Sequence, residues 1–142
     1  MYTRVKLEKT NYKEIEHELL DESHYGEINS IYRDYSMYKG FDSVMPLFIE
    51  DIKQTNTEVV GYRNTQGELV AFSLILLYPS QLSVSADQFA WNYKDPKLKL
   101  GYKSLRSECA RYKRLGFEYF YLGDYYDYKA DVKGFEISRP FN

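Results

Sequence analysis

The residues with the clearest chemical potential lie in a short segment, residues 97–104 (KLKLGYKS), between a predicted strand and a predicted helix. Gly101 has no side chain to keep a ligand away from the backbone, and the first amide groups of a helix point outward without intrahelical partners. Ser104 can add a hydroxyl. Three lysines add positive charge: Lys97, Lys99 and Lys103. Because unpaired amides and positive charge at a helix start favour anions, we predict that this turn binds phosphate.

The charge distribution along the chain supports this prediction. The net charge is −2, but residues 94–114 contain 8 Lys/Arg and 2 Asp/Glu, a balance of 8 − 2 = +6. Residues 1–58 contain 7 Lys/Arg and 12 Asp/Glu, a balance of 7 − 12 = −5. A local positive field attracts phosphates whatever the total charge. A solvated helix face, or plain RNA binding with neighbouring tyrosines for stacking, would give the same pattern.

The sequence shows no arrangement typical of covalent catalysis. Cys109 falls on the apolar side of a predicted helix, where a free cysteine is usually core. Direct acyl transfer to an amine remains, and it needs a proton acceptor, donors for the oxyanion and a donor for the leaving group. Carboxylates and tyrosines can fill these roles. The candidate catalytic residues are Asp87, inside a predicted strand, and Asp124 and Tyr128, after the last predicted strand. For each of them, a surface or packing role is the alternative.

Hydrophobic periodicity predicts the elements that position these residues. Residues 3–7 form a first strand. Apolar residues at helical spacing predict helices over residues 11–20 and 28–35, and a third helical segment carrying residues 45–52. Gly40 separates the second from the third.

In the second half of the chain the spacing of the hydrophobic residues changes from that of helices to that of strands. Residues 57–63 and 68–78 flank a short loop ending in Gly67 and predict an antiparallel hairpin, followed by a strand over residues 82–93. Residues 101–115 form the next helix, which Gly116 ends, and residues 118–122 form an aromatic strand. A strand–helix–strand crossover after a meander predicts an α+β fold with a mixed, mostly antiparallel sheet flanked by helices. The ligand cleft is then expected at the loop of residues 93–101.

Bulk composition limits the remaining possibilities. A chain of 142 residues predicts one domain spanning 1–142. A single cysteine excludes an intrachain disulfide and a multi-cysteine zinc site, and we expect no metal site from His17 and His24. The sequence has no apolar run long enough for a membrane span and no signal-peptide pattern at its start, so the expected location is the cytoplasm and no membrane partner is expected.

Several short motifs occur in a defined order between residues 93 and 136: Asp95-Pro96, Leu100-Gly101 with Ser104, Glu108-Cys109-Ala110, Tyr121-Leu122-Gly123 and Tyr128-Lys129. This series resembles the C-terminal region of arginyl-tRNA–protein transferases and their bacterial leucyl-transferring relatives. The resemblance covers roughly a third of the chain. It implies a GNAT-type acyltransferase fold, which agrees with the element order above.

The resemblance also implies a reaction and a site. The activity would be transfer of an amino acid from a charged tRNA to the amine of a protein or peptide, such as a protein N-terminus, with no covalently bound cofactor. By resemblance, residues 100–104, including Leu100 and Tyr102, would contact the phosphate or ribose of the donor, and Tyr128 and Lys129 would lie near the acceptor. An acetyl-CoA-dependent N-acetyltransferase and a non-catalytic GNAT-fold binding module are the alternatives. Lys103 stands where the acetyl-CoA loop usually has a small residue, which favours the tRNA donor.

Overall fold

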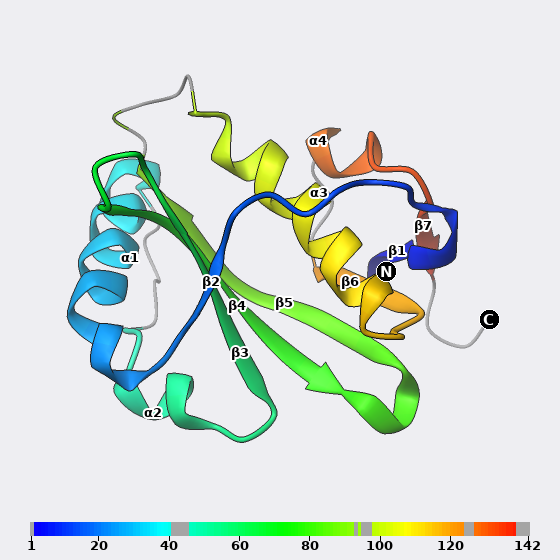
Figure 1. Cartoon of the computed structure of the whole chain (residues 1–142), viewed down its shortest axis with the longest axis horizontal. Coiled ribbons are helices and arrows are strands. Elements are labelled where there is room, and N and C mark those ends of the chain that lie inside the picture. Colours follow the sequence, from blue (N-terminus) through cyan, green and yellow to red (C-terminus); the bar gives the residue numbers. More distant parts are fainter. Residues whose placement is uncertain (1, 41–45, 93, 95–97, 124–126, 139–142) are drawn as a thin grey trace. The chain divides into compact units, whose positions relative to one another are not determined.

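The computed structural model describes residues 2–40, 46–92, 94, 98–123 and 127–138. Its elements follow the chain from blue to red in Figure 1. The strands are β1 (Tyr2–Lys6), β2 (Glu18–Leu20), β3 (Thr57–Arg63), β4 (Leu69–Tyr78), β5 (Ser83–Trp91), β6 (Tyr119–Gly123) and β7 (Phe135–Ser138). The α-helices are α1 (Tyr25–Lys39), α2 (Ile49–Lys53), α3 (Leu100–Arg114) and α4 (Asp127–Ala130). Three short 3₁₀ turns join them: η1 (Leu7–Lys9), η2 (Glu22–His24) and η3 (Pro79–Gln81).

The strands form one mixed sheet in the order β2-β3-β4-β5-β6-β1-β7. β1 runs antiparallel to both β6 and β7, and β2 runs antiparallel to β3. β5 and β6, which α3 connects, run parallel, as a helical crossover requires. The predicted mostly antiparallel α+β fold is therefore confirmed, and the predicted hairpin, β5, α3 and β6 lie within two residues of their expected bounds.

Contacts divide the chain into two compact units. The first comprises Met1–Ile15, Leu76–Asp87 and Gly101–Asn142, and the second comprises Glu16–Ile75 and Gln88–Leu100. In the first unit, one side of α3 packs on the sheet through Tyr112, whose ring lies 5.7 Å from that of Phe120 on β6 and 5.9 Å from that of Phe117. These large buried rings fix α3 against its sheet.

The second unit has its own core under α1. Ile28 and Tyr32, one helical turn apart, pack with Phe72 and Leu74 of β4 and with Ile52 of α2. The helix ends at Gly40, whose φ of +68° is the left-handed conformation common at helix C-termini. This interruption was predicted, and so was the helix before it.

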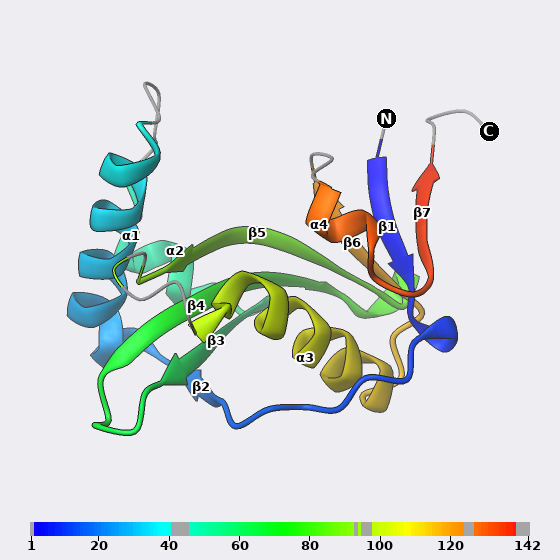
Figure 2. The same cartoon turned by 90° about the horizontal axis from the view of Figure 1, so that it is seen from above.

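The prediction of a helix over residues 11–20 is wrong. Residues 10–17 form an extended segment, and β2 follows. Figures 1 and 2 both show this segment, in blue, running along α3. Its part in the first unit, residues 10–15, is called the strap below. The Ile15 amide donates to Ser107 Oγ at 2.9 Å, and Lys113 Nζ donates to the Thr10 carbonyl. Because a short isolated helix is marginal in water, these tertiary partners outweigh the local apolar period.

The C-terminal segment, which the sequence left unassigned, forms β7 beside β1. The Lys6 amide donates to the Gly134 carbonyl at 2.9 Å, just before β7 begins. Gly134 has a φ of +81°, and a Cβ there would lie 2.5 Å from the Lys6 carbonyl oxygen. This close approach needs glycine, and it holds the start of β7 against the end of β1.

Candidate functional site

The predicted donor turn forms the first turn of α3. Leu100 is buried, Gly101 is half-buried, and Tyr102 and Lys103 are exposed. Lys99, immediately before the helix, is exposed and has a φ of +50°, in the left-handed region that side chains other than glycine rarely adopt. Strained residues of this kind cluster at functional sites. Gly101 itself is half-buried, so part of its backbone surface is exposed at the helix start, where a phosphate is predicted to bind.

The other predicted donor residues differ in accessibility. The Ser104 side chain is buried at 3% exposure, and its hydroxyl donates to the Gly101 carbonyl at 3.4 Å. The Ser104 hydroxyl is therefore buried and is not available at the surface of the turn. Lys97 lies outside the described residues.

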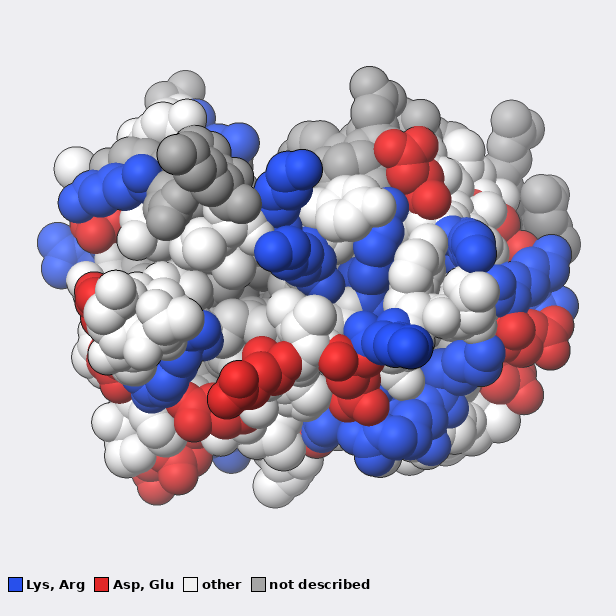
Figure 3. Space-filling model, turned by 45° about the horizontal axis from the view of Figure 1, so that its top comes forward, with Lys and Arg blue, Asp and Glu red and all other residues white. Residues whose placement is uncertain are grey.

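Much of the basic run of α3 is used by the strap. Arg114 makes two hydrogen bonds to the carboxylate of Glu14, at 2.7 and 3.0 Å, and Lys113 binds the Thr10 carbonyl. Figure 3 shows one face of the molecule, on which groups of blue Lys and Arg side chains lie beside red Asp and Glu side chains. The charge excess of residues 94–114 is thus partly structural.

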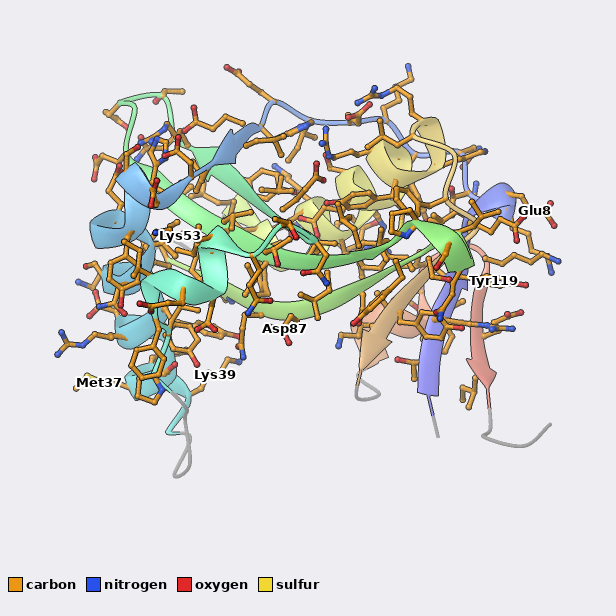
Figure 4. The ribbon with its side chains drawn as sticks, turned by 90° about the horizontal axis from the view of Figure 1, so that it is seen from below. Glu8, Met37, Lys39, Lys53, Asp87 and Tyr119 are labelled. Carbon is orange, nitrogen blue, oxygen red and sulfur yellow. The ribbon has the colours of Figure 1, made fainter. Side chains whose placement is uncertain are left out.

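The predicted catalytic residues are described to different extents. Asp87 is exposed, and Figure 4 shows it projecting from the ribbon of β5. It lies two residues beyond Ser85, the last β5 residue paired with β6. Asp124 lies outside the described residues, as does the side chain of Tyr128, whose backbone is in α4. Lys129 of the same helix donates to the Leu122 carbonyl at 2.8 Å and so ties α4 to the end of β6.

Cys109 is a core residue. Its side chain has no exposed surface, and burial, with the nearby Glu108 carboxylate, raises the pKa of the thiol to about 12. A thiol with that pKa is protonated at neutral pH and is a poor nucleophile. An acyl-enzyme on Cys109 is therefore disfavoured.

A stacked cluster that was not among the predicted site residues lies beside the predicted donor turn. The guanidinium of Arg106 lies 3.4 Å from the ring centre of Tyr102 and 5.5 Å from that of Tyr12 on the strap. The spacing of four residues between Tyr102 and Arg106 could have indicated their contact. Tyr12 could not have been found, because its segment was expected to be helical.

A separate cavity lies within the second unit. It has a volume of about 400 Å³ between α1 and residues 46–48, and its lining includes Tyr32, Arg33, Met37 and Phe48. The Tyr25 hydroxyl donates to the Leu47 carbonyl at 2.5 Å and fixes one wall. In the described ranges of the chain, no cluster of His, Cys, Asp and Glu could hold a metal ion. None of the described helices combines the length and apolar character needed to cross a bilayer.

Comparison with known proteins identifies the family. The sequence model described as "Arginine-tRNA-protein transferase, C terminus" matches residues 6–134. The chain belongs to this family. Among curated proteins, no sequence is detectably similar to this one.

Solved structures similar to this arginine-tRNA-protein transferase C-terminus domain share its fold. The C-terminal domain (DUF2156) assigned to a lysylphosphatidylglycerol synthetase of Agrobacterium fabrum matches with a TM-score of 0.67 and 14% identity over 86% of this chain and 45% of that one. An acetyltransferase of the GNAT family from Novosphingobium aromaticivorans matches with a TM-score of 0.67 and 14% identity, over 97% and 59%. An aminoglycoside acetyltransferase from an uncultured soil metagenomic sample, in complex with sisomicin, matches with 0.63 and 15%, over 82% of each chain.

These likenesses show a GNAT-like α+β fold. This chain spans less than half the length of the Agrobacterium domain.

Proposed function

We propose that the chain is an N-acyltransferase that moves an aminoacyl group from a charged tRNA directly to an amine of a protein or peptide. The observation that carries this proposal is the family match over residues 6–134, which includes the whole of α3. The half-buried Gly101 at the start of α3 supports it, because the first amides of a helix lack intrahelical partners and suit the phosphates of the donor.

The reaction we propose forms one amide bond and breaks one ester bond. The acceptor amine attacks the carbonyl carbon of the aminoacyl ester, the bond between that carbon and the ribose oxygen breaks, and the amine loses a proton. A carboxylate takes this proton, and Asp87 and Asp124 are the candidates. Tyr128 gives a proton to the leaving ribose oxygen. The protonated thiol of Cys109 takes no part, so no acyl intermediate forms on this cysteine.

Acetyl-CoA is the alternative donor, and a donor panel separates the two. Thermal unfolding is measured with charged tRNA, uncharged tRNA, acetyl-CoA and CoA, together with transfer of a radiolabelled amino acid or acetyl group to a peptide N-terminus. We expect stabilisation by tRNA that weakens steeply with salt, because phosphate contacts release counterions. Stabilisation by the CoA compounds alone would reassign the donor, and binding without any transfer would indicate a binding module.

A matched pair of variants tests the donor turn. Gly101→Asp places a carboxylate where a phosphate is proposed to bind, and we expect loss of donor binding. Gly26→Asp is the control, because Gly26 is likewise the second residue of its helix, α1. A carboxylate in the first turn of a helix is favourable in both variants, so both should fold. Equal donor affinity in the wild type and Gly101→Asp would remove the donor site from this turn.

The acid role is tested with Tyr128→Phe. Loss of the phenolic proton should slow the transfer step while donor and acceptor binding remain close to the wild type. An unchanged single-turnover rate would exclude Tyr128 as the proton donor.

A further inference from the structure

The stacked cluster of Tyr102, Arg106 and Tyr12 has the features of a ligand site. Arg106 lies in the second turn of α3, and its side chain passes under the ring of Tyr102. The separation of 3.4 Å between the guanidinium carbon and the Tyr102 ring centre is that of planar stacking. The strap supplies the more distant ring of Tyr12 at 5.5 Å. Both rings lie within the range of a cation–π contact.

Arg106 is buried but uses few of its hydrogen-bond donors. The residue is only 8% exposed. Within the described part of the chain, Nη1 donates to the Tyr102 carbonyl at 3.2 Å, and no second hydrogen bond of the guanidinium is found. A guanidinium has five N–H donors, and a largely buried charge is normally paired with an anion. The open edge of Arg106 is therefore suited to an anionic ligand.

Tyr102 has the complementary property. It is 52% exposed although Arg106 covers one of its faces. A ring held on one side by a guanidinium offers its other side as a flat, preorganised surface. Unpaired RNA bases bind proteins by stacking on such aromatic rings. Lys103, next in sequence and exposed, adds positive charge for the RNA backbone.

The strap holds the cluster in place. The hydroxyl of Tyr12 accepts a hydrogen bond from the Lys133 amide at 2.9 Å, and Asn11 Oδ1 accepts one from Lys133 Nζ at 3.0 Å. Tyr12 is therefore fixed from the side of β7 while it contacts Arg106. A cluster tied at both ends costs little ordering entropy on binding.

We infer that this cluster binds the unpaired 3′ end of the donor RNA, with a base stacked on Tyr102 and a phosphate on the open edge of Arg106. The inference rests on the proposed aminoacyl-tRNA donor and makes it more specific. The adenine and 3′-phosphate of CoA carry similar chemistry, so the test includes CoA.

The experiment measures equilibrium binding of uncharged tRNA, which needs no chemistry. Wild type and Tyr102→Ala are compared on a full-length transcript, on the same transcript without its unpaired 3′ nucleotides, and on CoA. We expect Tyr102→Ala to weaken binding of the full-length transcript about tenfold and to leave the shortened one within about twofold, since stacking contributes on that scale per base. Tyr102→Phe keeps the ring and should bind within about twofold of the wild type.

Tyr38→Ala is the matched control. Tyr38 is also an exposed helical tyrosine, 57% exposed, with the Lys39 ammonium 6.0 Å from its ring centre, and Figure 4 shows Lys39 on α1. It should leave both affinities unchanged. Arg106→Lys keeps the positive charge but loses the planar guanidinium. It should also weaken binding of the full-length transcript only, provided that its unfolding midpoint matches that of the wild type.

Three results would overturn the inference: equal losses for both transcripts, equal losses in Tyr102→Ala and Tyr38→Ala, or a Tyr102→Ala defect confined to CoA. Failure of the proposed function would give a different result. Tyr102→Ala would then still weaken binding of the full-length transcript alone, but charged tRNA would give no transfer product.

Discussion

Gly134 provides a quantitative test of how the end of β1 holds the start of β7. In Gly134→Ala, the new methyl group meets two costs. A side chain at a φ of +81° costs about 1–2 kcal/mol, and a Cβ 2.5 Å from the Lys6 carbonyl oxygen forces a backbone shift, for which overpacking gives about 1–3 kcal/mol. The total is about 3 kcal/mol or more. For 142 residues the unfolding entropy is about 0.3 kcal/mol per kelvin, so the Tm should fall by about 10 °C.

Two other glycines separate these costs. Gly116 has a φ of +95° with open space where a methyl group would lie, so Gly116→Ala carries only the backbone strain and should lower the Tm by about 3–6 °C. Gly26 has open space and an ordinary φ, and Gly26→Ala in α1 should raise the stability by up to about 1 kcal/mol. Thermal and urea unfolding of the three variants give the comparison. If Gly134→Ala is no more destabilised than Gly116→Ala, the close approach to Lys6 is not a constraint.

Three further predictions concern α3 and the strap. Cys109→Ala should retain transfer activity, because the buried thiol is protonated, and iodoacetamide should leave Cys109 unmodified in the folded protein at neutral pH. The fold raises the pKa of the Cys109 thiol from its ordinary value of 9.0 to about 12. The contribution of this thiol to the free energy of unfolding is therefore present below pH 9 and declines as the pH rises toward 12. Urea unfolding at rising pH should show that the wild type loses stability more steeply than Cys109→Ala. Ser107→Ala removes the acceptor of the Ile15 amide and should cost about 1 kcal/mol in urea unfolding, whereas an unchanged midpoint would mean that the strap does not depend on this bond. Arg114→Ala, which breaks the exposed pair with Glu14, should give a small loss of Tm at low salt that vanishes at high salt, and a loss independent of salt would indicate packing instead.

Local pattern was enough for the central elements. The alternating and continuous apolar runs of β3, β4 and β5, and the apolar face of α3 with Cys109 and Tyr112, were visible because their periods match the burial that the fold gives them. Local pattern failed nearer the two ends of the chain, at the helix predicted over residues 11–20 and at β7, which was not predicted. Leu19 and Leu20 look helical together, yet in β2 Leu20 enters the core while Leu19 is 51% exposed, as strand alternation requires.

The candidate site divides in the same way. Gly101, Tyr102 and Lys103 could be found because the strand–turn–helix pattern is local. The partnership of Arg106 with Tyr12 could not, because it joins residues 94 positions apart through a strap that only packing holds extended.

The sequence alone therefore determined the mixed sheet, the parallel crossover around α3 and the start of α3 at which the donor turn is predicted, since each follows from neighbouring residues and their period. Only the tertiary structure decided that β1 lies between β6 and β7, that the strap runs along α3, and that part of the basic run binds the strap. Those features depend on contacts between segments that are far apart in the sequence. The free energy of such contacts cannot be inferred from the pattern of neighbouring residues.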